Sequence, residues 1–152
     1  MNTLFRYQGC GLDNVYLRNG YRETVSAAGE KGVFIEDIEG LHKVIAIVIV
    51  DDTSPLDAKT FRFLRKELDM SQRKFGEYMD VEEQTVSLWE RARKPIPHAA
   101  DVLLRTLTKE TCSGNAELMR MLERMNSIDR EIRSNIELEK NDGHWEQLKQ
   151  AA

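Results

Sequence analysis

The sequence predicts an α+β protein: a small N-terminal antiparallel β-sheet region, an all-α unit of short helices, and a long C-terminal helix. Two observations predict this division. Short runs of β-branched and aromatic residues, separated by glycine-containing turns, occupy the first third of the 152 residues. From Asp57 onward, apolar residues recur every three or four positions, which is the period of a helix. We expect the three parts to span residues 1–56, 57–109 and 110–152.

The small β-rich region, residues 1–56, contains three strand-like runs. They are Asn14–Arg18, Tyr21–Val25 and Gly32–Asp37. Asn19-Gly20 separates the first two runs, and both residues tolerate the positive φ angles of a two-residue hairpin turn. A second turn is expected at residues 29–32. The runs and turns together predict a small antiparallel sheet.

The run from Leu41 to Val50 is ambiguous between strand and helix. Its many β-branched residues favour a strand, whereas four positions have helical spacing: Leu41, Val44, Ile45 and Val48. We expect a buried helix. The longest purely apolar stretch, Val44–Val50, is far shorter than the roughly 18 residues needed to cross a bilayer. The N-terminus lacks the apolar core of a secretory signal, so we expect a cytoplasmic protein without a membrane partner.

Four short helices are expected in residues 57–109, after a turn-rich break at Asp51–Pro55. Each is identified by its own apolar stripe: Phe61, Leu64 and Leu68; Phe75 and Met79; Val86 and Trp89; Val102, Leu103 and Leu107. Three basic residues of the first helix, Arg62, Arg65 and Lys66, are expected to face solvent. Together the four stripes predict a compact all-α unit.

A last helix is expected from Ala116 to Lys140, beyond a break at Cys112–Asn115. Apolar residues recur there every three or four positions, with charges of both signs between them: Leu118, Leu122, Met125, Ile128, Ile132 and Ile136. This stripe either packs within the chain or forms the seam of a homodimer. We favour the seam, because few other surfaces remain to cover the stripe.

Metal, cofactor and catalytic sites are not expected. The chain has two cysteines, Cys10 and Cys112, and three histidines, and none of them form the close pairs of a structural zinc site. It also lacks a phosphate-binding loop, a nucleophile elbow and a paired-carboxylate motif. We therefore expect a binding protein rather than an enzyme.

Charge is distributed unevenly along the chain. The total is −4, from 22 Lys and Arg against 26 Asp and Glu. Residues 1–56 and 110–152 each carry −3, whereas residues 57–109 hold 11 basic and 9 acidic residues and carry +2. The total argues against a chain that coats nucleic acid by bulk charge. The middle third alone can present a basic face.

The stretch Met70–Pro97 has the spaced features of two short helices joined by a tight turn. These features are an N-cap at Ser71, a small residue at Gly76, a turn residue at Asp80, and inward-facing Val86 and Trp89. A side chain at Gly76 would obstruct a closely crossing helix. The helices expected are residues 72–79 and 83–92, and this arrangement is a helix-turn-helix.

These features resemble the Xre/Cro family of DNA-binding domains. The shared elements are Met70-Ser71-Gln72, the small residue Gly76, and Thr85-Val86-Ser87-Leu88-Trp89-Glu90. The resemblance covers residues 57–109. It implies that the second helix of the pair enters the major groove of DNA, with its N-terminal residues against the base edges.

The resemblance implies a role for each polar position of this unit. Gln72 would bond a phosphate or a nearby base, and Thr85 would reach the backbone. The residues implied to face bases are Glu83, Gln84, Ser87 and Leu88. The phosphate contacts implied are Arg73, Lys74, Arg91, Arg93 and Lys94. Glu82 and Glu83 replace neutral polar residues usual in the family, and their charge predicts weak non-specific DNA binding.

The function implied is a sequence-specific transcriptional regulator, most simply a repressor, that binds an inverted-repeat DNA operator as a homodimer. A β-rich region before such a unit also resembles the MqsA-type antitoxins, although their paired zinc-binding cysteines are absent here. The alternative is therefore an antitoxin of a type II toxin–antitoxin pair, in which residues 1–56 neutralise a partner toxin. A third hypothesis assigns a small effector to the aromatic residues of this region.

Overall fold

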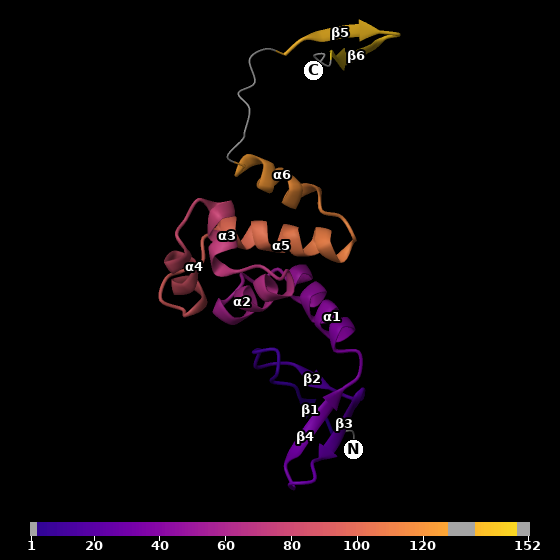
Figure 1. Ribbon diagram of the computed structural model, residues 1–152, viewed down its shortest axis with the longest axis vertical. Helices are drawn as coiled ribbons and strands as arrows, with labels where there is room; N and C mark the ends of the chain where they lie inside the picture. The colour runs from indigo at the N-terminus through magenta and orange to yellow at the C-terminus, as the bar shows by residue number, and fades with distance from the viewer. Residues whose placement is uncertain (1–2, 128–135, 149–152) are drawn as a thin grey trace.

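The computed structural model describes residues 3–127 and 136–148. These residues form an α+β fold of six helices and three separate two-stranded antiparallel sheets (Figure 1). Two β-hairpins come first, the six helices follow, and a third hairpin ends the described chain. None of the helices in these two ranges combines the length and the apolar character needed to span a membrane.

The N-terminal strands pair differently from the prediction. Strand β1 (Phe5–Arg6) pairs with β2 (Tyr16–Leu17), and β3 (Tyr21–Val25) pairs with β4 (Lys31–Ile35). A turn joins β3 to β4, but it lies earlier than the expected residues 29–32: the loop closes with a bond from the Ser26 nitrogen to the Glu30 oxygen (2.8 Å), and Gly32 is already paired with Thr24 in the sheet.

The hairpin predicted across Asn19-Gly20 is wrong. Strand β2 instead joins an upstream segment, and this pairing buries Tyr7 and Leu12 in the core. Gly20, at φ 79°, redirects the chain between β2 and β3. Burial of two large side chains therefore outweighs the local turn preference. The result is two small sheets rather than one.

Helix α1 (Ile38–Asp51) resolves the ambiguous apolar run in favour of a helix. Asp37 caps its start by accepting a bond from the Gly40 nitrogen (3.1 Å). The expectation of full burial is wrong, since the helix buries only one face. Val44 and Val48 point outward and are 59% and 63% exposed.

The four helices predicted in residues 57–109 are confirmed. They are α2 (Ala58–Glu67), α3 (Gln72–Met79), α4 (Glu83–Glu90) and α5 (His98–Cys112). Their core is built around the Phe61 ring, which meets the rings of Phe75 and Trp89 edge-on at centroid distances of 5.2 and 5.9 Å.

The apolar stripe predicted for α5 is partly wrong. Val102 is 47% exposed, while Leu104 and Leu107 are fully buried. Helix α5 packs against both α1 and α2, so its buried face follows Ala100, Leu104 and Leu107 at helical spacing. Val102 lies on the opposite side of the helix.

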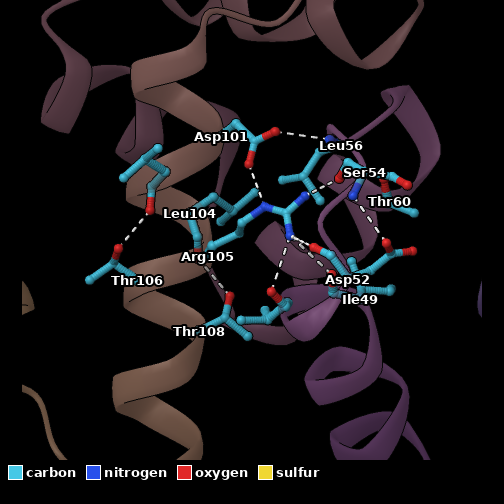
Figure 2. Close-up of polar contacts among 12 residues, drawn as sticks. Ile49, Asp52, Ser54, Leu56, Thr60, Asp101, Leu104, Arg105, Thr106 and Thr108 are labelled. Carbon is cyan, nitrogen blue, oxygen red and sulfur yellow. Dashed lines mark hydrogen bonds and ion pairs between the residues drawn. The ribbon is translucent and has the colours of Figure 1, made fainter.

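Arg105 on α5 ties the end of α1 to the helical unit. Its guanidinium donates to main-chain oxygens at and beyond the end of α1, namely those of Ile49, Val50, Asp52 and Ser54 (Figure 2). Its Nε bonds Asp101 Oδ1 at 2.5 Å, and Asp101 Oδ2 accepts the Leu56 nitrogen at 2.9 Å. These bonds cross the domain division predicted between residues 56 and 57.

The long C-terminal helix predicted from Ala116 to Lys140 is wrong. Helix α6 runs only from Glu117 to Met125, and β5 (Leu138–Asn141) and β6 (His144–Gln147) form a hairpin further on. Asp142 and Gly143, at φ 48° and 80°, have the paired positive angles that a tight two-residue hairpin turn requires. An Asp-Gly pair is a local hairpin signal, and it outweighs the helical spacing of the apolar residues here. Ile128 and Ile132 of the predicted stripe lie outside the described residues.

Helix α6 packs on this chain's own helices. Leu118 and Leu122 lie against the core, as the alternative to a dimer seam requires. Asn126 Nδ2 donates to the Glu77 oxygen at the end of α3 (3.1 Å), and the Tyr78 hydroxyl donates to Glu123 Oε1 (3.3 Å). Partial burial, followed by the negative charge of Glu123, raises the pKa of Tyr78 to about 12. Leu118 and Leu122 of the predicted stripe are therefore covered by the core of the same chain.

Candidate nucleic-acid interface

Helix α3, the turn after it and the start of α4 are formed as the sequence predicted. Ser71 Oγ accepts the Lys74 nitrogen at 3.0 Å and caps α3. Asp80 ends α3 in the left-handed conformation, at φ 56°. A β-carbon on Gly76 would lie 2.6 Å from the Val81 oxygen, so the absence of a side chain lets the turn pack directly on α3.

Helix α4 ends at Glu90, two residues before the predicted end. The Ala92 nitrogen donates to the Trp89 oxygen (3.2 Å) and the Arg93 nitrogen to the Leu88 oxygen (2.8 Å). This paired arrangement, with Ala92 at φ 57°, is the Schellman ending of a helix. It fixes the backbone of Arg93 and Lys94 at the end of α4.

The predicted base-facing residues share one face of α4. Glu83, Gln84, Ser87 and Leu88 follow one another at helical spacing, and Arg91 continues the same face. Glu83 and Gln84 are exposed, Ser87 and Leu88 are half-buried, and Val86 and Trp89 are buried on the other side. Thr85 lies at the edge of the exposed face. Figure 1 shows α4 at the edge of the helical unit opposite α1.

The predicted residues of α3 already have partners within the chain. Gln72 Nε2 donates to Glu90 Oε1 at 3.3 Å. Arg73 lies 3.6 Å from Glu77, and the Lys74 ammonium lies 5.2 Å from the centre of the Tyr78 ring. Arg73 is exposed and its pair is weak, so its side chain can exchange Glu77 for a phosphate.

A buried ion pair between Arg65 and Glu90, which the sequence did not predict, lies behind the exposed face of α4. Arg65 donates from Nε and Nη2 to both carboxylate oxygens of Glu90, at 2.6 and 2.7 Å, and from Nη1 to the Met70 oxygen at 2.7 Å. The two side chains are only 8% and 2% exposed. The expectation that Arg65 faces solvent is therefore wrong. Its place one turn after Phe61, on the same face, was the signal that could have revealed it.

Three cations at the end of α4 are exposed: Arg91, Arg93 and Lys94. None of them forms an ion pair with any residue in the described ranges. The exposed face of α4 therefore begins with hydrogen-bonding groups and ends at Arg91, and Arg93 and Lys94 add two exposed positive charges just beyond the helix. Such a face can bond base edges and neutralise phosphates.

The described residues contain no cluster of three or more His, Cys, Asp or Glu side chains placed to hold a metal ion.

No protein-family model matches this chain, and no curated protein or solved structure is similar enough to it to count as a match.

Proposed function

We propose that this chain is a cytoplasmic, sequence-specific DNA-binding transcriptional regulator, acting as a repressor and binding an inverted-repeat operator as a homodimer. One observation carries the proposal. The exposed face of α4 carries polar side chains, and three exposed cations that form no ion pair among the described residues follow at and just beyond its end, Arg91, Arg93 and Lys94, on a chain whose overall charge is −4. A local basic face on an acidic chain favours a specific anionic ligand over bulk adsorption.

The chemistry of each position suits a place in the major groove. Gln84 can bond adenine through two hydrogen bonds, Glu83 can accept from the amino group of cytosine, and Leu88 can contact a thymine methyl group. Arg91, Arg93 and Lys94 would bind phosphates and set the orientation. Because Glu82 and Glu83 repel phosphates, base contacts and the doubling of sites in a dimer supply much of the affinity.

Two substitutions separate base contacts from phosphate contacts. The operator is first identified by selecting the fragments of genomic DNA that the purified protein binds. The affinity for this operator and for its single-base variants is then measured at several salt concentrations. Gln84→Ala should relax the preference at one base pair by about 1–3 kcal/mol. Arg93→Ala should weaken binding to every sequence. It should also reduce the slope of log affinity against log salt concentration by about one.

Lys43→Ala is the matched control for Arg93→Ala, since it removes one exposed positive charge from α1, at the opposite edge of the helical unit. Its affinity and salt dependence should stay close to those of the unchanged protein. Equal effects of the Lys43 and Arg93 substitutions would rule out the phosphate role. Unchanged base preference in the Gln84 variant would rule out the proposed placement of α4.

A groove beside α1 favours a second candidate function, an antitoxin that binds a partner toxin through residues 1–56. The groove measures about 460 Å³, and its walls include Leu12, Val15, Leu17, Val44 and Val48. An exposed apolar groove on a small protein is typical of a protein-binding site.

The test of this second function uses the full chain and the product of a neighbouring toxin-like reading frame, expressed together. Val44→Ser with Val48→Ser should abolish co-purification of that product, because both side chains line the groove. Val102→Ser, on the exposed side of α5, is the matched control and should leave it unchanged. Co-purification that survives the double substitution would place the partner elsewhere.

A further inference from the structure

The C-terminal hairpin of β5 and β6 gathers three carboxylates on one of its two faces. Because side chains alternate along a strand, Leu138, Lys140 and Trp145 share one face, and Trp145 is 70% exposed. The other face carries Glu139 and Glu146. Glu137 belongs to that face as well, since its carbonyl oxygen accepts the Leu148 nitrogen at 2.9 Å and extends the same ladder.

The negative charges of the acidic face destabilise the hairpin. Glu139 and Glu146 are direct partners across the strands, and like charges in that position destabilise a hairpin. Lys140, the basic residue of this hairpin, lies on the opposite face. Glu137, Glu139 and Glu146 form no ion pair within residues 3–127 and 136–148. An isolated two-stranded hairpin is itself only marginally stable in water. A cationic surface would therefore stabilise it.

The end of α4 is such a surface. Arg91, Arg93 and Lys94 are three exposed cations without carboxylate partners in the described chain, and they equal the three carboxylates in number and are opposite to them in charge. Arginine guanidinium groups and carboxylates form strong charge-assisted hydrogen bonds. The same cations are those expected to bind DNA phosphates, which are also anionic oxygens.

We infer that the acidic face of the β5–β6 hairpin docks on Arg91, Arg93 and Lys94 of its own chain and competes with DNA for them. This inference rests on the proposed function, because it gives the α4 surface two alternative occupants. Docking would weaken non-specific DNA binding, whereas an operator that also forms base contacts would displace the hairpin.

The connection is long enough for docking within one chain. Helix α6 ends beside α3, because Asn126 bonds the Glu77 oxygen, and α3 leads through a short turn into α4. Helix α4 has eight residues and is about 12 Å long. The connection from Ser127 to Ile136 can span at most about 30 Å. The hairpin can therefore reach the far end of α4.

The first test measures binding to non-specific duplex DNA at low salt, with the full chain. The triple variant E137Q/E139Q/E146Q removes the acidic face without altering the length of the chain. It should bind about tenfold more tightly, the order expected from the loss of three exposed ion pairs. The control E23Q/E30Q/E36Q makes the same change in net charge on the exposed N-terminal hairpin and its border. Equal gains in the two triple variants would overturn the inference.

The second test needs no DNA. A carbodiimide that joins carboxylates to amines without a spacer should link Lys94 to Glu137, Glu139 or Glu146 within a monomer, as mapped by mass spectrometry. The link should be absent from E137Q/E139Q/E146Q and present in the control. This result would stand even if the protein bound no DNA. A link found only between differently isotope-labelled copies, or no such link, would overturn docking within one chain.

Discussion

Replacing Glu90 with alanine is expected to lower the free energy of unfolding by about 3–5 kcal/mol. The substitution leaves the Arg65 guanidinium buried without a counter-charge, in a position that is 8% exposed. Its remaining bond to the protein is the one from Nη1 to the Met70 oxygen. Gln72 also loses its hydrogen bond to Glu90. Because Glu90 is the last residue of α4, the variant also loosens the helix that carries the proposed base contacts.

Urea unfolding followed by circular dichroism measures this change. Glu83→Ala removes an exposed carboxylate from the same helix and should change stability by no more than about 0.5 kcal/mol. Arg65→Ala combined with Glu90→Ala should cost less than the sum of the single substitutions, since the two charges are coupled. A loss below about 1 kcal/mol for Glu90→Ala would contradict a buried, fully bonded ion pair.

Replacing Arg105 with alanine is expected to lower the free energy of unfolding by about 2–4 kcal/mol. Arg105 satisfies several carbonyl oxygens at the end of α1 and pairs with Asp101, and the two side chains are 17% and 12% exposed. The substitution leaves these carbonyl groups and the Asp101 carboxylate with fewer partners. Arg105→Lys should recover only part of the loss, because an ammonium cannot reproduce the planar fork of donors.

Hydrogen exchange shows whether the bonds of Arg105 to the end of α1, called the clamp below, stabilise that end locally or the whole fold. Amides in the last turn of α1 should exchange faster in Arg105→Ala, relative to amides in α3 and α4, because the clamp acts at the end of α1. Lys109→Ala, one turn further along α5, removes an exposed cation that lies 3.9 Å from Asp51 and should have little effect. A uniform rise in exchange across all the helices would contradict a local role for Arg105.

The clamp joins the two regions to which the proposed functions are assigned. The groove beside Val44 and Val48 lies on α1, and the proposed DNA-binding face lies on α4. Helix α5 contacts α1 and α2, and α2 packs against α4. Leu12, Ile45 and Leu56 also belong to the same hydrophobic core as Phe61 and Trp89. The groove and the face of α4 are therefore built on one continuous packed core.

The local features of residues 57–109 were predictable from the sequence. Apolar spacing located four helices, the hydroxyl of Ser71 predicted the start of α3, and Asp80 and Gly76 predicted the tight turn. Each of these signals depends on residues a few positions apart, because helical periodicity, capping and turn angles are local properties. The candidate DNA-binding positions on α4 were found in the same way, since a helix brings residues three and four apart onto one face.

Contacts between distant segments were decided only by the tertiary structure. Arg65 and Glu90 are 25 positions apart, Arg105 holds carbonyl groups more than 50 positions upstream, and β2 pairs with β1 rather than with its neighbour β3. A side chain's charge does not reveal its partner, so Arg65 resembled any solvent-exposed arginine. By itself, the sequence determined which segments of residues 57–109 are helical and which residues α4 exposes. Packing decided which charges are buried, because burial depends on what the rest of the fold places against each residue.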